Sequence, residues 1–231
     1  MTDTEPLSRT AASTAVEAIG WRYLLATLNA AVPVTSLAEA ARLGAAAVTA
    51  CGPDADDHLR LDLRPDRLDL SVQSRVLGAV TEVDVALVRA VSTALAELGA
   101  VPAGATSRQL RRPVQMLELA VDARDIPAVR PFWKAVLALV DDPADPGPHG
   151  ALVDPAGQLP TVWFQQMDAP RPQRNRIHLD ITVSHDEGAA RVRAALDAGG
   201  RLVEDSPARA FWVLADAEGN EVCVCTWQDR D

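Results

Sequence analysis

The stretch Arg176-Ile177-His178-Leu179-Asp180-Ile181-Thr182-Val183 alternates strictly between polar and apolar residues. Period-two alternation is typical of a β-strand with one buried face, so a strand is predicted here with Arg176, His178 and Asp180 on its polar face. Residues 114–122 alternate in the same way. When the two stretches are aligned, Glu118 takes the position of His178.

Each of these strands precedes a predicted helix, at residues 126–140 in the first case and 186–198 in the second. The second helix ends at Gly199-Gly200, and strands are predicted after it at 201–203, 211–215 and 221–227. The first copy is less regular, with short strands near 151–153 and 161–167. The sequence therefore predicts a duplicated βαβββ unit, in which Glu118 and His178 are equivalent positions.

Three segments of this half resemble the vicinal-oxygen-chelate superfamily of glyoxalases, bleomycin-resistance proteins and extradiol dioxygenases. They are Asp122-Ala123-Arg124-Asp125 with Phe132-Trp133, then Asn175-Arg176-Ile177-His178-Leu179-Asp180, and Asp216-Ala217-Glu218-Gly219-Asn220-Glu221-Val222-Cys223-Val224. The resemblance implies two repeats whose sheets form a cup around a small oxygenated ligand. Phe132 and Trp133 are expected in the core, because the helices of this fold pack outside the cup.

The resemblance also implies a divalent metal, Mn, Fe, Ni or Zn, held by the first and last strands of each repeat. By position the metal ligands are His178, Glu118 and Cys223, with Gln165 or Gln166 on the matching strand of the first repeat. Cys223 stands where many members have glutamate, and this mixed donor set differs from the usual His and Glu sets. Glu118 and Glu221 are the candidate catalytic carboxylates, and Glu221, on the same face as Cys223, is also an alternative metal ligand in place of the thiol. Ligand contacts are expected from Trp163, Gln165, Arg176, Asp180 and Trp212.

The amino-terminal half predicts a helix at 8–20, an extended stretch at 23–34, a helix at 36–51, a hairpin at 58–72 and a helix at 81–98. This order resembles the pterin-4a-carbinolamine dehydratases. Their activity depends on a His-His-Pro loop and a later histidine, but the corresponding positions here read Cys51-Gly52-Pro53 and Gln73-Ser74. Neither position therefore offers the histidine side chain that acts as acid or base in that family. His58 is expected to be a solvated histidine that opens a strand.

Taken together, the sequence predicts an α+β protein with a pterin-dehydratase-like domain at 1–100, a linker at 101–112 and a glyoxalase-like domain at 113–231. The formal net charge of -10 disfavours nucleic acid and anionic membranes as partners. No signal sequence or membrane span is predicted, so the expected location is the cytoplasm. The expected partners are a small-molecule ligand and a second copy of the chain in a homodimer. The three cysteines suit no disulfide framework or zinc ribbon, and Cys51 is expected to be buried.

Several functions are compatible with the sequence. One is a metal-dependent lyase, isomerase or dioxygenase in which Glu118 or Glu221 moves a proton. A second is a metal-free protein that binds a drug or metabolite in the same cup, which the cysteine at position 223 favours. A pterin dehydratase is a third, against which the missing histidines argue, and a fourth assigns the amino-terminal half to dimerisation or partner binding.

Overall fold

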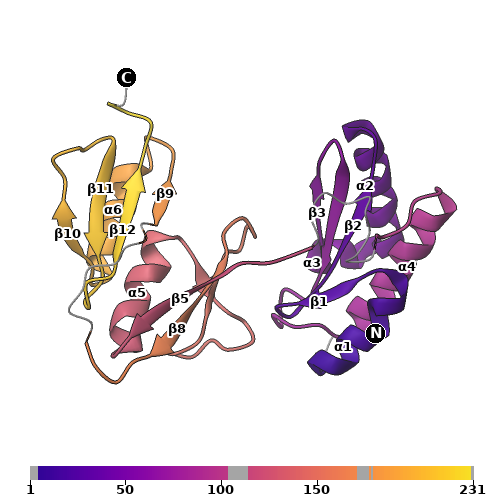
Figure 1. Cartoon of the computed structure of the whole chain (residues 1–231), viewed down its shortest axis with the longest axis horizontal. Coiled ribbons are helices and arrows are strands. Elements are labelled where there is room, and N and C mark those ends of the chain that lie inside the picture. Colours follow the sequence, from indigo (N-terminus) through magenta and orange to yellow (C-terminus); the bar gives the residue numbers. More distant parts are fainter. Residues whose placement is uncertain (1–4, 104–113, 171–176, 178, 230–231) are drawn as a thin grey trace. The chain divides into compact units, whose positions relative to one another are not determined.

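The computed structural model describes residues 5–103, 114–170, 177 and 179–229. The chain divides into two compact units, Met1–Met116 and Leu117–Asp231, called the amino-terminal and carboxy-terminal units below (Figure 1). Both mix helices with β-sheets, which confirms the predicted α+β class. None of the described helices combines the length and hydropathy that crossing a bilayer requires.

The amino-terminal unit packs helices on one side of a four-stranded sheet with the strand order β1-β2-β4-β3 (Figure 1). Its core contains Trp21, whose indole Nε1 donates to Ser92 Oγ at 2.9 Å. The elements along the chain are α1 (Arg9–Val16), the 3₁₀ turn η1 (Glu17–Ile19), β1 (Arg22–Leu24), β2 (Thr27–Pro33), α2 (Leu37–Cys51), the 3₁₀ turn η2 (Gly52–Asp54), α3 (Ala55–His58), β3 (Leu59–Leu63), β4 (Arg67–Val72) and α4 (Glu82–Glu97).

Side-chain caps set the starts of the two long helices where the sequence predicts them. Ser36 accepts a hydrogen bond from the backbone N–H of Glu39 at 3.1 Å and begins α2. Thr81 and Asp84 form a capping box at the start of α4. The expected single extended stretch at 23–34 is wrong, however, because Leu25 and Ala26 turn the chain with φ angles of 45° and 58°. The result is an antiparallel pair, β1 and β2.

His58 is not the solvated histidine that the sequence predicts. It ends α3 and is only 7% exposed, and its Nδ1 lies 2.8 Å from Oδ1 of Asp84, which is fully buried. The other carboxylate oxygen of Asp84 accepts from the backbone N–H and the hydroxyl of Thr81. The capping carboxylate of α4 therefore also fixes the end of α3, a tertiary contact that local sequence does not reveal.

The carboxy-terminal unit consists of two βαβββ repeats with the same topology. The first contains β5 (Glu118–Ala123), α5 (Ile126–Val136), β6 (Val140–Asp141), β7 (Leu152–Val153) and β8 (Thr161–Gln166). The second contains β9 (Asp180–Thr182), α6 (Gly188–Asp197), β10 (Arg201–Glu204), β11 (Phe211–Ala215) and β12 (Glu221–Cys225).

In each repeat the first strand pairs in parallel with the last strand and stands at the edge of its sheet. The strand orders are β5-β8-β7-β6 and β9-β12-β11-β10, so the predicted duplication is confirmed. The helices α5 and α6 pack on each other (Figure 1), and one hydrophobic core joins both repeats. Phe132 and Trp133 of α5 are buried in this core, as predicted.

Candidate functional site between the repeats

The register of β5 and β8 assigns their side chains to the two faces of the first sheet. Val121 lies opposite Phe164, and both are buried in the core that includes α5. The alternate residues point to the opposite face, called the site face below. On the first sheet the site face carries Glu118, Ala120, Asp122, Thr161, Trp163 and Gln165.

The site face of the second sheet is partly apolar. Cys223 lies opposite Asp180 in the parallel pair of β12 and β9. Cys223 and Cys225 cluster with Val213 and Phe211, and both thiols are almost completely buried. Glu221 shares the alternation of Cys223 and therefore lies on the same face.

The surroundings of Cys223 keep its thiol protonated. Burial raises the pKa of Cys223 to about 12, and the hydrogen bond to Asp180 and the charge of Asp180 act in the same direction. Only the thiolate binds metals or attacks electrophiles efficiently. At neutral pH Cys223 is therefore a small neutral side chain rather than a nucleophile.

We expect the folded chain to resist thiol reagents. Cys51, Cys223 and Cys225 are free and buried, and burial also raises the pKa of Cys51 to about 11. At pH 8 the native protein should release almost no thionitrobenzoate from Ellman's reagent, and all three thiols should react in guanidinium. A Cys223→Ala control should leave two thiols to react in guanidinium. Rapid reaction of the native wild type, lost in Cys223→Ala, would contradict the assignment of Cys223 as protonated.

The same pKa shifts give the stability a pH dependence. Because an exposed thiol ionises near pH ~8.5 and the folded thiols ionise higher, the folded chain holds these protons more tightly. The contribution of Cys51 and Cys223 to the free energy of unfolding is thus present below pH ~8.5 and falls as the pH rises toward the folded values.

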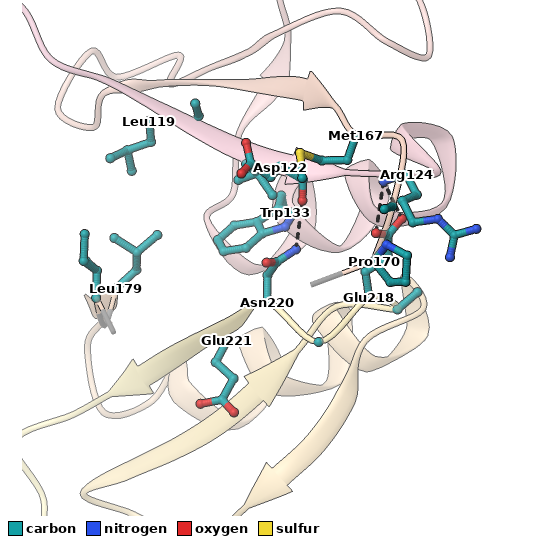
Figure 2. Close-up of a pocket in the computed structure, with 16 residues that line it drawn as sticks. Leu119, Asp122, Arg124, Trp133, Met167, Pro170, Leu179, Glu218, Asn220 and Glu221 are labelled. Carbon is teal, nitrogen blue, oxygen red and sulfur yellow. Dashed lines mark hydrogen bonds between the residues drawn. The ribbon is translucent and has the colours of Figure 1, made fainter. Parts of the chain in front are cut away.

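A cavity of about 670 Å³ lies between the two repeats. Figure 2 shows β5 on one side of it and the β11–β12 turn with Glu221 on the other. Four consecutive residues of β5, from Leu119 to Asp122, line it. Consecutive strand residues point to alternate faces, so the cavity runs along the free edge of β5. The other lining residues are Arg124, Trp133, Met167, Ala169, Pro170, Ile177, Leu179, Ala217, Glu218, Gly219, Asn220 and Glu221.

The predicted site residues divide into several groups. Glu221 lines the cavity, and Asp180 and Cys223 face each other beside it on the second sheet. Glu118, Trp163 and Gln165 occupy the site face of the first sheet but are not among the described lining residues. Residues 176 and 178, the predicted ligand contact Arg176 and metal ligand His178, lie outside the described residues.

Trp212 does not share the face of Cys223. Alternation on β11 gives that face to Val213, whereas Trp212 packs with the core of α5 and α6. A Cβ built on Gly188 of α6 would come within 3.2 Å of the Trp212 ring. The structure thus corrects the expected ligand contact of Trp212, whose indole fills the space beside a helical glycine.

Sequence reasoning missed several residues that line the cavity. Alternation predicts Leu119 and Leu179 on the apolar strand faces, but both reach the cavity at the edges of their sheets. Trp133 was assigned to the core and is buried there, yet it also lines the cavity. Of these missed residues, Asp122 is the one that the sequence could have indicated, because alternation places it on the same strand face as Glu118.

The metal-ligand positions that the resemblance implies can be compared between the first and the second repeat. Asp180 corresponds to Ala120 by the strand alignment, and their registered partners are Cys223 and Trp163. Trp163, rather than Gln165, is therefore the counterpart of Cys223. An indole is no metal ligand, so the position of Trp163 does not fit a divalent metal, and Cys223 offers sulfur where many members have a glutamate oxygen. Among the described residues, no group of three His, Cys, Asp or Glu side chains could hold a metal ion.

Residues 118–225 match the family model described as a glyoxalase-like domain. This segment forms a glyoxalase-like domain. It is the duplicated unit whose cavity is described above, and it spans a little under half of the chain. No curated protein shows significant sequence similarity to the chain.

Three solved structures similar to parts of this chain each cover less than half of it. A glyoxalase/bleomycin resistance protein/dioxygenase family enzyme from Burkholderia phytofirmans PsJN is 18% identical, covers 47% of this chain and 95% of its own, and has a TM-score of 0.39. Fosfomycin resistance protein FosX from Mesorhizobium loti is 10% identical over 48% of this chain and 90% of its own, with a TM-score of 0.38. A transcriptional coactivator/pterin dehydratase from Brucella melitensis is 18% identical over 39% of this chain and 98% of its own, with a TM-score of 0.35.

Proposed function

We propose that the glyoxalase-like domain binds a small oxygenated molecule, without a metal, in the cavity between its repeats. The main observation in support of this proposal is the cavity itself, which residues of both repeats line. Its volume of about 670 Å³ falls within the range of about 300 to 1,000 Å³ that is usual for small-molecule sites.

The lining suits a ligand with an apolar body and a few polar groups. Leu119, Leu179 and Met167 offer apolar surface, and Trp133 adds an aromatic ring. The polar side chains at the cavity include Asp122, Asn220 and Glu221. Apolar walls would hold the body of the ligand by burial, and these polar groups would orient its oxygens.

The metal-free form of the proposal rests on the donor set. Glu118 and His178 are the residues of the implied set whose chemistry suits a hard divalent metal, while the indole of Trp163 and the buried thiol of Cys223 occupy the other two positions. Such a metal would polarise oxygens of the ligand. In the enzyme alternative Glu221 is the carboxylate best placed for proton transfer, since it lies at the cavity and Glu118 is not among the described lining residues.

Elemental analysis of protein purified without a metal-affinity tag tests this proposal. We expect far less than one Mn, Fe, Ni or Zn per chain in the wild type and no change in His178→Ala. A near-stoichiometric metal that disappears in His178→Ala would overturn the metal-free proposal and favour the enzyme alternative.

For the amino-terminal unit we propose a pterin-dehydratase-like fold without the dehydratase chemistry. Cys51 ends α2, and Gly52 and Pro53 continue into η2, so the loop that holds histidines in that family offers a buried thiol here. Its proposed role is dimerisation or partner binding, within a cytoplasmic homodimer.

A further inference from the structure

The β11–β12 turn, residues 216–220, contacts the first repeat through three side chains. Asp216 is fully buried and accepts from Nε1 of Trp133 at 3.0 Å. Glu218 accepts from the backbone N–H groups of Arg124, at 2.9 and 3.0 Å, and of Asp125, at 2.7 Å. The side-chain amide of Asn220 donates to Asp216 at 2.8 Å and lies 3.5 Å from the carbonyl oxygen of Asp122.

The corresponding turn of the first repeat provides a comparison within the same molecule. Asp154 occupies the position of Asp216 and accepts from the backbone N–H groups of Ala156, Gln158 and Leu159 in its own turn. Asp216 makes similar bonds to Glu218 and Asn220 of its own turn and in addition accepts from Trp133 of the other repeat. The second turn thus combines the same kind of local bonds with a contact to the other repeat.

Among the described strands none from one repeat pairs with a strand of the other, so each sheet keeps a free edge. The helices and the shared core join the repeats on one side. The turn joins them at the cavity, where Figure 2 shows the bonds to Arg124 and Asp122.

The turn also stands between two hollows. Arg124, Met167, Ala217 and Glu218 line both the cavity described above and a second hollow of about 750 Å³. The bonds from the Glu218 carboxylate to the start of α5 therefore lie in the wall between them. A carboxylate at backbone N–H groups that begin a helix is a favourable arrangement, because the helix dipole adds to the hydrogen bonds.

We infer that the Asp216–Asn220 turn is the positioning element of the ligand cavity, and that Glu218 fixes the separation of β5 from the second repeat. The inference rests on the proposed function, because it assigns the turn to the same cavity. Glu218 is a positioning residue in this account.

Hydrogen exchange of the full chain, followed by mass spectrometry, tests the inference without a ligand. Glu218→Ala should speed exchange in peptides covering residues 118–128 about tenfold or more, which corresponds to ~1.4 kcal/mol. Glu218→Gln keeps one acceptor oxygen and should give a smaller increase. The matched control is Asp197→Ala, which removes an exposed acid from α6 of the same unit and should leave these peptides unchanged.

Two results would overturn the inference. One is exchange at residues 118–128 that is equally slow in Glu218→Ala and Asp197→Ala. The other is exchange that rises uniformly through the carboxy-terminal unit, since that would give Glu218 a role in overall stability alone.

A parallel titration with Nile red, a neutral carbonyl-bearing dye, separates the inference from the proposed function. Local acceleration together with an altered dye affinity in Glu218→Ala supports both. Local acceleration without dye binding to the wild type supports the positioning role and contradicts the ligand cavity.

Discussion

Replacing Asp84 by alanine is expected to lower the free energy of unfolding of the amino-terminal unit by about 3 to 5 kcal/mol. The fully buried carboxylate accepts from the N–H and the hydroxyl of Thr81 and lies 2.8 Å from Nδ1 of His58. Its loss leaves these groups without that partner in a dry interior and removes the cap of α4. Urea denaturation of the full chain, with hydrogen exchange reporting α4 separately, measures the change.

Glu82→Ala is the matched control, because Glu82 lies in the same first turn of α4 but is exposed. Its expected effect is below about 0.5 kcal/mol. If Asp84→Ala costs no more than Glu82→Ala, the contact between α3 and α4 through His58 does not exist in solution.

Filling the cavity is expected to abolish ligand binding without unfolding the domain. Ala120 lines the cavity and is exposed, so an indole at this position would occupy the cavity and spare the core. Ala120→Trp should weaken Nile red binding about 100-fold or more, equivalent to about 2.7 kcal/mol. Fluorescence titration measures the affinity, and the thermal midpoint should stay close to that of the wild type.

Ala190→Trp provides the control, since Ala190 is an exposed alanine on α6 that does not line the cavity. This variant should bind the dye as the wild type does. Equal affinities in Ala120→Trp and Ala190→Trp would place the dye, and the proposed ligand, elsewhere on the molecule.

Local sequence patterns predicted much of the fold because the deciding interactions are themselves local. The Ser36 cap lies within one turn of its partner, and so does the capping box of Thr81 and Asp84. Strand alternation revealed the duplication for the same reason, and it was enough to identify Glu118 and His178 as equivalent positions of the two repeats. The turn at Leu25 and Ala26 escaped prediction because neither residue is a usual turn former.

The site, and other contacts between distant parts of the chain, were less predictable, because they depend on how separate elements meet. His58 and Asp84 are 26 positions apart, and only the packing of α3 against α4 joins them. Trp212 and Val213 are both apolar, so alternation could not decide which of them faces Cys223. The cavity follows the edge of β5, and therefore residues from both strand faces line it, including Leu119, which alternation assigns to the core.

The metal prediction depends on assigning the metal-ligand positions of the superfamily to this sequence one residue at a time. Cys223 was recognised as an unusual residue at a glutamate position. The register added that Trp163 is its counterpart and that Asp180 lies beside the thiol. The indole of Trp163 leaves one position of the implied donor set without a metal ligand, which supports the metal-free proposal.

The most direct test of a metal-free ligand cavity is an equilibrium titration of the wild-type chain with Nile red, with and without EDTA. Saturable binding of about one dye per chain, with the same affinity in EDTA, is the predicted result. The account would be contradicted by the absence of saturable binding, or by binding that EDTA abolishes and added Mn²⁺ or Zn²⁺ restores.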